Sequence, residues 1–250
     1  MADHSQMKLG RKAIKTDTRT LRLARYFTED LPSPPVAKDW SKGITSFGMM
    51  LNDQLGDCTI AGCGHAVQVL SANAGAEITV PDSAILAAYE QWDGYKPADP
   101  STDQGGVELD VLTDWRKNGL AGHKLLAFAD PEATNVIEIK QCIALFGGVY
   151  IGVSLPLTAQ TQDVWDAVDD PGDGSAQAGS WGGHCVFVCA YDSDGLTCIT
   201  WGAQKKMTWT FWNEYVDEAH ALLSADWLGA NGAPSGFDLA QLQADLALIQ

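Results

Sequence analysis

The sequence contains no apolar run of the roughly 18 residues that a membrane-spanning helix requires. Its opening stretch, MADHSQMKLGRKAIK, also lacks the apolar core of a secretory signal. We therefore expect no membrane partner and a cytoplasmic location, with a place in a virion or release by cell lysis as alternatives. In a reducing compartment the six cysteines should be free thiols rather than a disulfide framework.

Basic residues are scarce, because 16 lysines and arginines stand against 32 aspartates and glutamates, giving a formal net charge of −16. The first 25 residues reverse this balance: they hold seven basic residues against two acidic ones, which leaves −21 on the remainder. Such an acidic body should repel nucleic acid. The basic N-terminal arm, residues 1–30, is expected to lie on this body or to contact another acidic partner.

Patterns that bind metals or cofactors are missing as well. The spacings of cysteine and histidine do not resemble a zinc site, and the glycines form no phosphate-binding loop. Residues 163–177 carry five aspartates, but their irregular spacing does not match a calcium loop. We predict no cofactor, no metal site and a solvated loop over 163–177.

Hydrophobic patterns predict helices first and strands later along the chain, which is typical of an α+β fold with a helical lobe and a sheet lobe. The helices are expected at 58–76, 81–95, 105–119 and 133–147. Strands are expected at 148–156, 184–191 and 196–201, the last two joined by the turn sequence DSDG into a hairpin. The expected domain boundaries are an arm at 1–30, one domain at 31–228, and a linker with a C-terminal amphipathic helix at 229–250.

Two residues have the chemistry of nucleophilic catalysis. Cys58 follows a Gly-Asp pair at the start of the first predicted helix, where free N–H groups and the helix dipole should lower the pKa of a thiol. His184 stands at the start of a buried strand, after Gly182 and Gly183, and imidazole suits proton transfer. The amide of Gln54 could stabilise a developing oxyanion beside Cys58.

Five stretches together resemble the papain-like cysteine peptidases. They are LPSPPVAKDWSKG (31–43), NDQLGDC (52–58), the Gly-Gly pair that opens 105–119, GGHCVFVCAYD (182–192) and TWG (200–202). This resemblance implies a papain-like fold in which Cys58 is the nucleophile, His184 the general base, and Gln54 with the Cys58 amide the oxyanion hole. Trp181, Gly182, Gly183 and Trp201 bracket the histidine strand and are the expected substrate-binding or shielding residues, facing a peptide or protein substrate.

The sequence departs from the family pattern at three places. Gln54 lies two residues nearer to the cysteine than in the family, which makes Asn52 the other oxyanion candidate, and Thr59 replaces a tryptophan. The slot of the family's asparagine, the third member of the triad, holds Ile199. A hairpin register set by the DSDG loop predicts that Ile199 faces His184 and that Thr200 points away.

The same register has two further consequences. It places Cys189 opposite Cys198, where we expect packed thiols rather than a bond. It also leaves His184 without its family partner, so that water, a backbone carbonyl or Gln204 would have to orient the ring.

These observations favour a thiol-dependent peptide or amide hydrolase that uses a Cys–His dyad. A non-catalytic papain-like scaffold that serves binding or assembly, for example in a phage or bacterial particle, is the first alternative. It is favoured by Ile199, the basic arm and the C-terminal helix. A cell-wall peptide amidase, which also has its cysteine before its histidine, is the second alternative.

Overall fold

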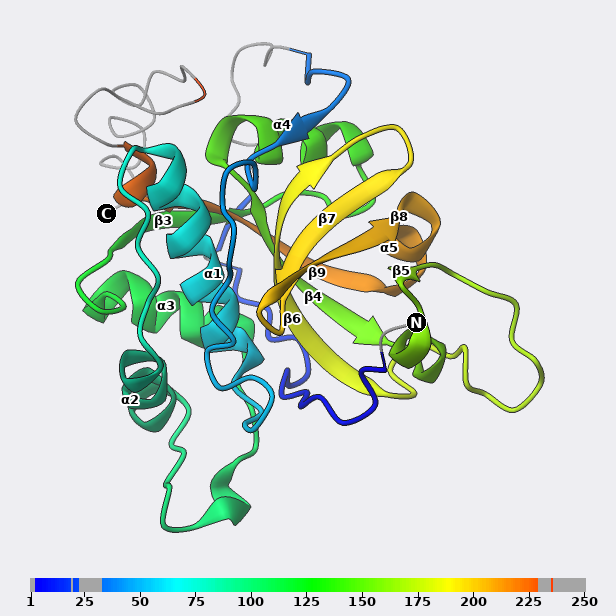
Figure 1. The fold of residues 1–250 in the computed structure, drawn as a ribbon, viewed down its shortest axis with the longest axis horizontal. Helices are drawn as coiled ribbons and strands as arrows, with labels where there is room; N and C mark the ends of the chain where they lie inside the picture. Colours follow the sequence, from blue (N-terminus) through cyan, green and yellow to red (C-terminus); the bar gives the residue numbers. More distant parts are fainter. Residues whose placement is uncertain (1–2, 19, 23–32, 229–234, 236–250) are drawn as a thin grey trace.

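A computed structural model describes residues 3–18, 20–22, 33–228 and 235 of the chain, and they form a mixed α+β fold (Figure 1). One nine-stranded sheet has the order β1-β3-β9-β4-β6-β7-β8-β5, with β2 paired separately to β6. The β1–β3 and β5–β8 pairs are parallel, and the other pairs are antiparallel. The strands are β1 (Leu21–Arg22), β2 (Lys38–Asp39), β3 (Leu125–Asp130), β4 (Val149–Leu155), β5 (Val164–Trp165), β6 (Gly182–Tyr191), β7 (Gly195–Thr200), β8 (Ala203–Thr208) and β9 (Val216–Ser224).

Helices α1, α2 and α3 gather on one side of the molecule and the strands β4 to β8 on the other, as Figure 1 shows. The helices are α1 (Cys58–Asn73), α2 (Asp82–Trp92), α3 (Glu108–Asn118), α4 (Val136–Phe146) and α5 (Trp209–Tyr215), with 3₁₀ turns η2 (Pro100–Thr102), η3 (Leu157–Thr161) and η4 (Asp226–Leu228). The four predicted helices and three predicted strands are all present, which confirms the α+β prediction.

Helix α1 is the buried centre of the fold, and every residue from Cys58 to Ser71 is buried. Glycine at position 62 lets the helix approach the sheet closely. A Cβ there would lie 3.0 Å from the Tyr150 ring of β4 and 3.3 Å from the Cys185 sulfur of β6. This contact holds the first turn of α1, and therefore Cys58, against the centre of the sheet.

Three longer strands were not predicted: β3, β8 and β9. β8 reads AQKKMT and β9 begins VDEAH, so charged residues interrupt the hydrophobic signal that identifies a strand. Lys205, Glu218 and His220 are nevertheless buried within these strands. They are buried because they have charged or polar partners, which a local pattern cannot reveal.

The β6–β7 hairpin contains a bulge that corrects the predicted register. Close to the DSDG turn the pairing is as predicted, but it shifts by one residue at Cys189. Beyond the bulge, Cys198 pairs with Val188 and Ile199 pairs with Phe187. The prediction that Cys189 lies opposite Cys198 is therefore wrong, because an extra residue on one strand displaces every later pair.

The described part of the arm lies on the body of the protein. In Figure 1 its dark-blue trace passes below α1 and across the ends of β4 and β6, and further on β1 adds to the sheet beside β3. The C-terminal helix predicted within 229–250 lies almost entirely outside the described residues, and the domain boundaries remain predictions. Among the described helices, none combines the length and the apolarity that crossing a bilayer would need.

Candidate active site

Cys58 is the first residue of α1, and its side chain is fully buried. Burial raises the pKa of its thiol to about 12, although the backbone N–H groups of Cys185 and Gly10 face the sulfur and favour the thiolate. The expected lowering of this pKa by the helix N-terminus is thus wrong for this arrangement, because loss of water outweighs the helix dipole. Gly10 belongs to the arm, so the arm itself contributes to covering the thiol.

His184 lies on β6, one residue before the Cys185 N–H that faces the Cys58 sulfur. The ring is fully buried, and its Nε2 lies 2.7 Å from the Thr200 hydroxyl. Its Nδ1 is buried without a hydrogen-bond partner among the described residues. A proton on Nδ1 would therefore be a buried donor without an acceptor, so the geometry favours the tautomer in which Nε2–H donates to Thr200 and Nδ1 is free to accept a proton.

Thr200, rather than Ile199, faces His184. The bulge at Cys189 reverses the alternation of β7 relative to β6, so Ile199 lies opposite Phe187 and the next residue turns toward the histidine face. The prediction that Ile199 faces His184 and that Thr200 points away is wrong, and the Thr200 hydroxyl takes the orienting role that water, a backbone carbonyl or Gln204 was expected to fill. Gln204, a candidate for the same role, pairs with Ile199 from β8.

Trp201 covers the other side of the imidazole. Its ring stacks on His184 with centroids 4.6 Å apart and planes at 19°. The Trp181 ring is tilted against Trp201, with the two ring centroids 5.7 Å apart. Trp201 and Gly202 form the two-residue turn between β7 and β8, both with positive φ (47° and 70°), a pattern typical of a type I′ hairpin. The turn fixes the tryptophan beside the histidine, and burial lowers the pKa of His184 to about 3.

The two oxyanion candidates point to other partners. Gln54 is exposed, and its amide nitrogen lies 3.5 Å from the Asp53 carboxylate. Asn52 is buried, and its side-chain amide donates to the Asp57 carboxylate at 3.2 Å. Asp57 is the residue that precedes Cys58 in the sequence. The oxyanion role of Gln54 therefore remains a prediction.

The arm crosses the site as an extended segment. Gly106 donates to the Gly10 carbonyl at 2.8 Å and accepts from Lys12 at 2.8 Å, while Arg11 donates to the Gly183 carbonyl at 3.1 Å. A Cβ on Gly10 would lie 1.7 Å from the Gly56 carbonyl oxygen, so only glycine fits at this crossing. Gly183, which was predicted to bind substrate, binds the chain's own arm here.

The arm also contacts Trp201 and Gly182. The His4 ring stacks on Trp201 with centroids 5.1 Å apart, and the Trp201 indole donates to the Lys8 carbonyl at 3.4 Å. Leu9 lies where a Cβ on Gly182 would meet it at 3.0 Å. Residues 4 to 12 therefore run across every predicted substrate-binding position except Trp181.

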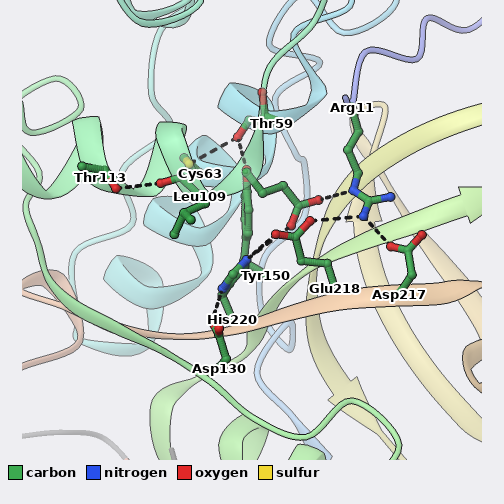
Figure 2. A network of polar contacts seen from close by, with 11 residues as sticks. Arg11, Thr59, Cys63, Leu109, Thr113, Asp130, Tyr150, Asp217, Glu218 and His220 are labelled. Carbon is green, nitrogen blue, oxygen red and sulfur yellow. Dashed lines mark hydrogen bonds and ion pairs between the residues drawn. The ribbon is translucent and has the colours of Figure 1, made fainter. Parts of the chain in front are cut away.

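A buried charged cluster surrounds the Arg11 side chain, and Figure 2 shows its fork aimed at Glu218 and Asp217. The Arg11 Nε lies 3.0 Å from Glu108 Oε1 on α3, and its Nη2 lies 3.1 Å from Glu218 Oε2 on β9. The His220 Nε2 lies 3.1 Å from the Glu218 carboxylate. Burial alone would lower the pKa of His220, but its acidic partners outweigh burial and raise this pKa to about 9.

Sequence reasoning missed this cluster, since its members are far apart in the chain. The only signal was the reversal of charge between the arm and the body. Glu108, Glu218 and His220 could each offer a ligand atom to a metal, all within 4.8 Å of one another. The Arg11 guanidinium lies among the same atoms and supplies the positive charge.

His65 and Cys63, which also lie on α1, belong to the core. His65 is buried and donates to the Gly48 carbonyl at 2.8 Å, and Cys63 lies 3.3 Å from the Thr59 carbonyl. All six cysteines are buried and free. Among the six cysteines, Cys58 is the one that lies at the start of α1.

Comparison with known proteins gives a fold but no closer relative. The chain matches no known protein-family profile and no curated protein sequence. Its fold is similar to xylellain, a cysteine protease from Xylella fastidiosa, with a TM-score of 0.64 and 12% identity over 89% of this chain and 98% of that one.

Two proforms are also similar in fold. Procathepsin B S9 from Trypanosoma congolense has a TM-score of 0.57 and 10% identity over 89% of this chain and 87% of its own. Digestive procathepsin L 3 from the larval midgut of Tenebrio molitor has a TM-score of 0.57 and 12% identity over 88% and 76%. The chain therefore has the papain-like fold that the sequence resemblance implied.

Proposed function

We propose that this protein is a thiol-dependent peptide or amide hydrolase, held in a latent form by its own N-terminal arm. Cys58 is the nucleophile and His184 the general base. The observation that carries the proposal is the state of His184: Nε2 hydrogen-bonds to Thr200, Trp201 stacks on the ring, and Nδ1 has no partner in the described part of the chain. An Nδ1 that is free to accept a proton, on the strand whose Cys185 N–H faces the Cys58 sulfur, supports His184 as the general base.

The chemical steps follow from these positions. The Cys58 thiol gives its proton to His184 Nδ1, and the thiolate attacks the carbonyl carbon of the scissile bond. The negative oxygen that forms lies near the first turn of α1, where backbone N–H groups lack intrahelical acceptors. His184 returns the proton to the leaving amine, and water then releases the acyl group from the sulfur.

The arm accounts for the inactive state that we propose for Cys58 and His184. With the site covered, burial raises the pKa of Cys58 to about 12 and lowers that of His184 to about 3, so both groups are neutral. A thiolate–imidazolium pair requires water or substrate in place of the arm. Two of the structures similar in fold are themselves named as procathepsins.

Cleavage of the arm in the folded chain tests the proposal. Residues 13–16 are exposed, so they can be replaced by the recognition sequence of a site-specific protease. After cleavage, we expect iodoacetamide to modify Cys58 at least about tenfold faster, since one unit of thiol pKa is a factor of ten in thiolate. Hydrolysis of a mixed peptide library should appear with the same time course.

Matched variants give the controls. Cys58→Ser should lose both the label and the hydrolysis, whereas Cys142→Ala, a buried thiol of α4, should lose neither. Gly10→Leu offers a second route to displacement, because any side chain there collides with Gly56. A Cys58 that stays unmodified after the arm has demonstrably left would overturn the proposal.

A non-catalytic scaffold is the second candidate. It is favoured by the fully buried thiol of Cys58, whose pKa burial raises to about 12. An uncovered Cys58 that reacts with iodoacetamide no faster than an ordinary thiol, with no hydrolysis of any peptide, would favour this candidate.

A further inference from the structure

Three carboxylates face the Arg11 guanidinium, and His220 lies beside the two buried ones. Glu108, Glu218 and Asp217 face the guanidinium, and the first two carboxylates are buried. Buried carboxylates without a cation are strongly unfavourable. His220 offsets part of this negative charge from within the body, and in this structure the Arg11 side chain of the arm supplies further positive charge between Glu108 and Glu218.

The backbone leaves a cavity of the right shape. A Cβ on Gly152 of β4 would lie 2.2 Å from Arg11 Nε and 2.4 Å from its Cζ, so the guanidinium occupies the space that any side chain at 152 would fill. The planar fork of arginine reaches Glu108 with Nε and Glu218 with Nη2 at the same time. A lysine, with a single ammonium group, could not make both contacts in this way.

The pocket lies next to the candidate nucleophile along the bound segment. The N–H of Gly10 faces the Cys58 sulfur, and the next residue is Arg11. The Arg11 N–H donates to the Gly183 carbonyl, and Gly106 bonds to the main chain of the flanking Gly10 and Lys12, which are contacts that any peptide could make. The side chain, by contrast, enters the acidic pocket, so selectivity must come from this position.

We propose that this acidic pocket is a substrate subsite for arginine, and that the arm occupies it as a substrate-like segment. The inference rests on the proposed function, because it names the class of peptide that the Cys58 site would cleave. Peptides that carry arginine beside the scissile bond would replace the arm, bind Gly106 and Gly183 through their backbone, and place the guanidinium between Glu108 and Glu218.

Citrulline gives the sharpest test, because it has the shape of arginine without the charge. The chain with its arm cleaved is offered pairs of fluorogenic peptides that differ only by arginine or citrulline at each position near the cleaved bond. At one position we expect kcat/KM to be at least about tenfold higher for arginine, as charged hydrogen bonds are worth this factor or more. Equal rates for every pair would overturn the proposal.

Variants locate the preference in the pocket. Glu218→Gln should reduce the ratio of arginine to citrulline toward one, and Gly152→Ala should reduce turnover of the arginine peptide by filling the cavity. Glu214→Gln makes the same chemical change on an exposed residue of α5 and should leave the ratio unchanged. The citrulline comparison on the unmodified pocket stands even where a variant fails to fold.

A binding assay separates this inference from the proposed function. A synthetic peptide of residues 5–15 is added to the cleaved chain, and its protection of Cys58 from iodoacetamide is compared with that of the citrulline-11 version. Stronger protection by the arginine peptide supports the subsite even if no peptide is hydrolysed. Hydrolysis without any arginine preference would leave the proposed function standing and overturn the subsite.

Discussion

At the scale of the residue, Thr200 is the unexpected member of the site. A threonine hydroxyl can accept the Nε2–H of His184 at 2.7 Å, much as an amide oxygen could, but it is neutral and small. Trp201 keeps water away from this bond by stacking on the ring. Thr200 is thus a positioning residue, which acts on the thiol only through the tautomer of His184.

Replacing Thr200 by valine should keep the shape and remove the hydrogen bond. A neutral hydrogen bond is worth about 1 kcal/mol, so we expect alkylation of Cys58 in the arm-cleaved chain to slow about fivefold at neutral pH. The pH profile of alkylation should also shift toward that of an isolated thiol. Thr200→Ser, which keeps the hydroxyl, should restore the profile, and a valine variant with the profile unchanged would contradict the role.

At the scale of the element, helix α1 and the β6–β7 hairpin form the site together. The hydrophobic pattern predicted both, because each is long and regular. The bulge at Cys189 was not predictable, since one extra residue in a strand leaves no mark in an alternating sequence. That single residue decides that Thr200, and not Ile199, faces His184. The position of the family's asparagine in the sequence therefore predicted the wrong partner for the ring.

Glycine 64 tests how tightly α1 is held. Alanine would normally stabilise a helix interior, but a Cβ at Gly64 would lie 2.4 Å from the Met50 sulfur and 3.0 Å from Ile85 Cδ1. We expect Gly64→Ala to lower the free energy of unfolding by about 1–3 kcal/mol, measured by urea denaturation. Ser83→Ala, on the exposed side of α2, should change it by less than about 0.5 kcal/mol, and a stabilised Gly64→Ala would show that α1 packs less closely.

At the scale of the whole molecule, the uneven charge noted in the sequence has a structural use. The basic arm lies across an acidic body and brings Arg11 to the buried carboxylates of Glu108 and Glu218. Sequence alone predicted that the arm could dock on the body, but it could not give the place. The docking site depends on residues from α3 and β9, which meet only in the folded chain.

The same charges make docking of the arm depend on pH. Burial and the neighbouring Glu218 charge raise the pKa of Glu108 to about 8, against the opposing charges of Arg11 and His220. Burial also acts to raise the pKa of Glu218, but His220 and Arg11 together bring this pKa below its usual value. At Glu218 the partner charges outweigh burial, so loss of the Arg11 charge on release of the arm favours protonation of this carboxylate, and docking is strongest where Glu218 is ionised and weakens as pH falls through its lowered pKa.

We therefore expect the arm to loosen in acid, as pH falls below the ordinary glutamate pKa of 4.5 and through the lowered pKa of Glu218. A dipyridyl disulfide, which reacts with thiols in acid, should modify Cys58 of the intact chain faster at pH 4 than at pH 8. Because buried His184 stays neutral down to a pKa of about 3, folding itself loses stability below pH 6.5, so circular dichroism must show an intact fold at the same pH. Glu218→Gln should flatten the dependence, and a thiol equally protected at pH 4 and pH 8 in a folded chain would contradict electrostatic docking of the arm.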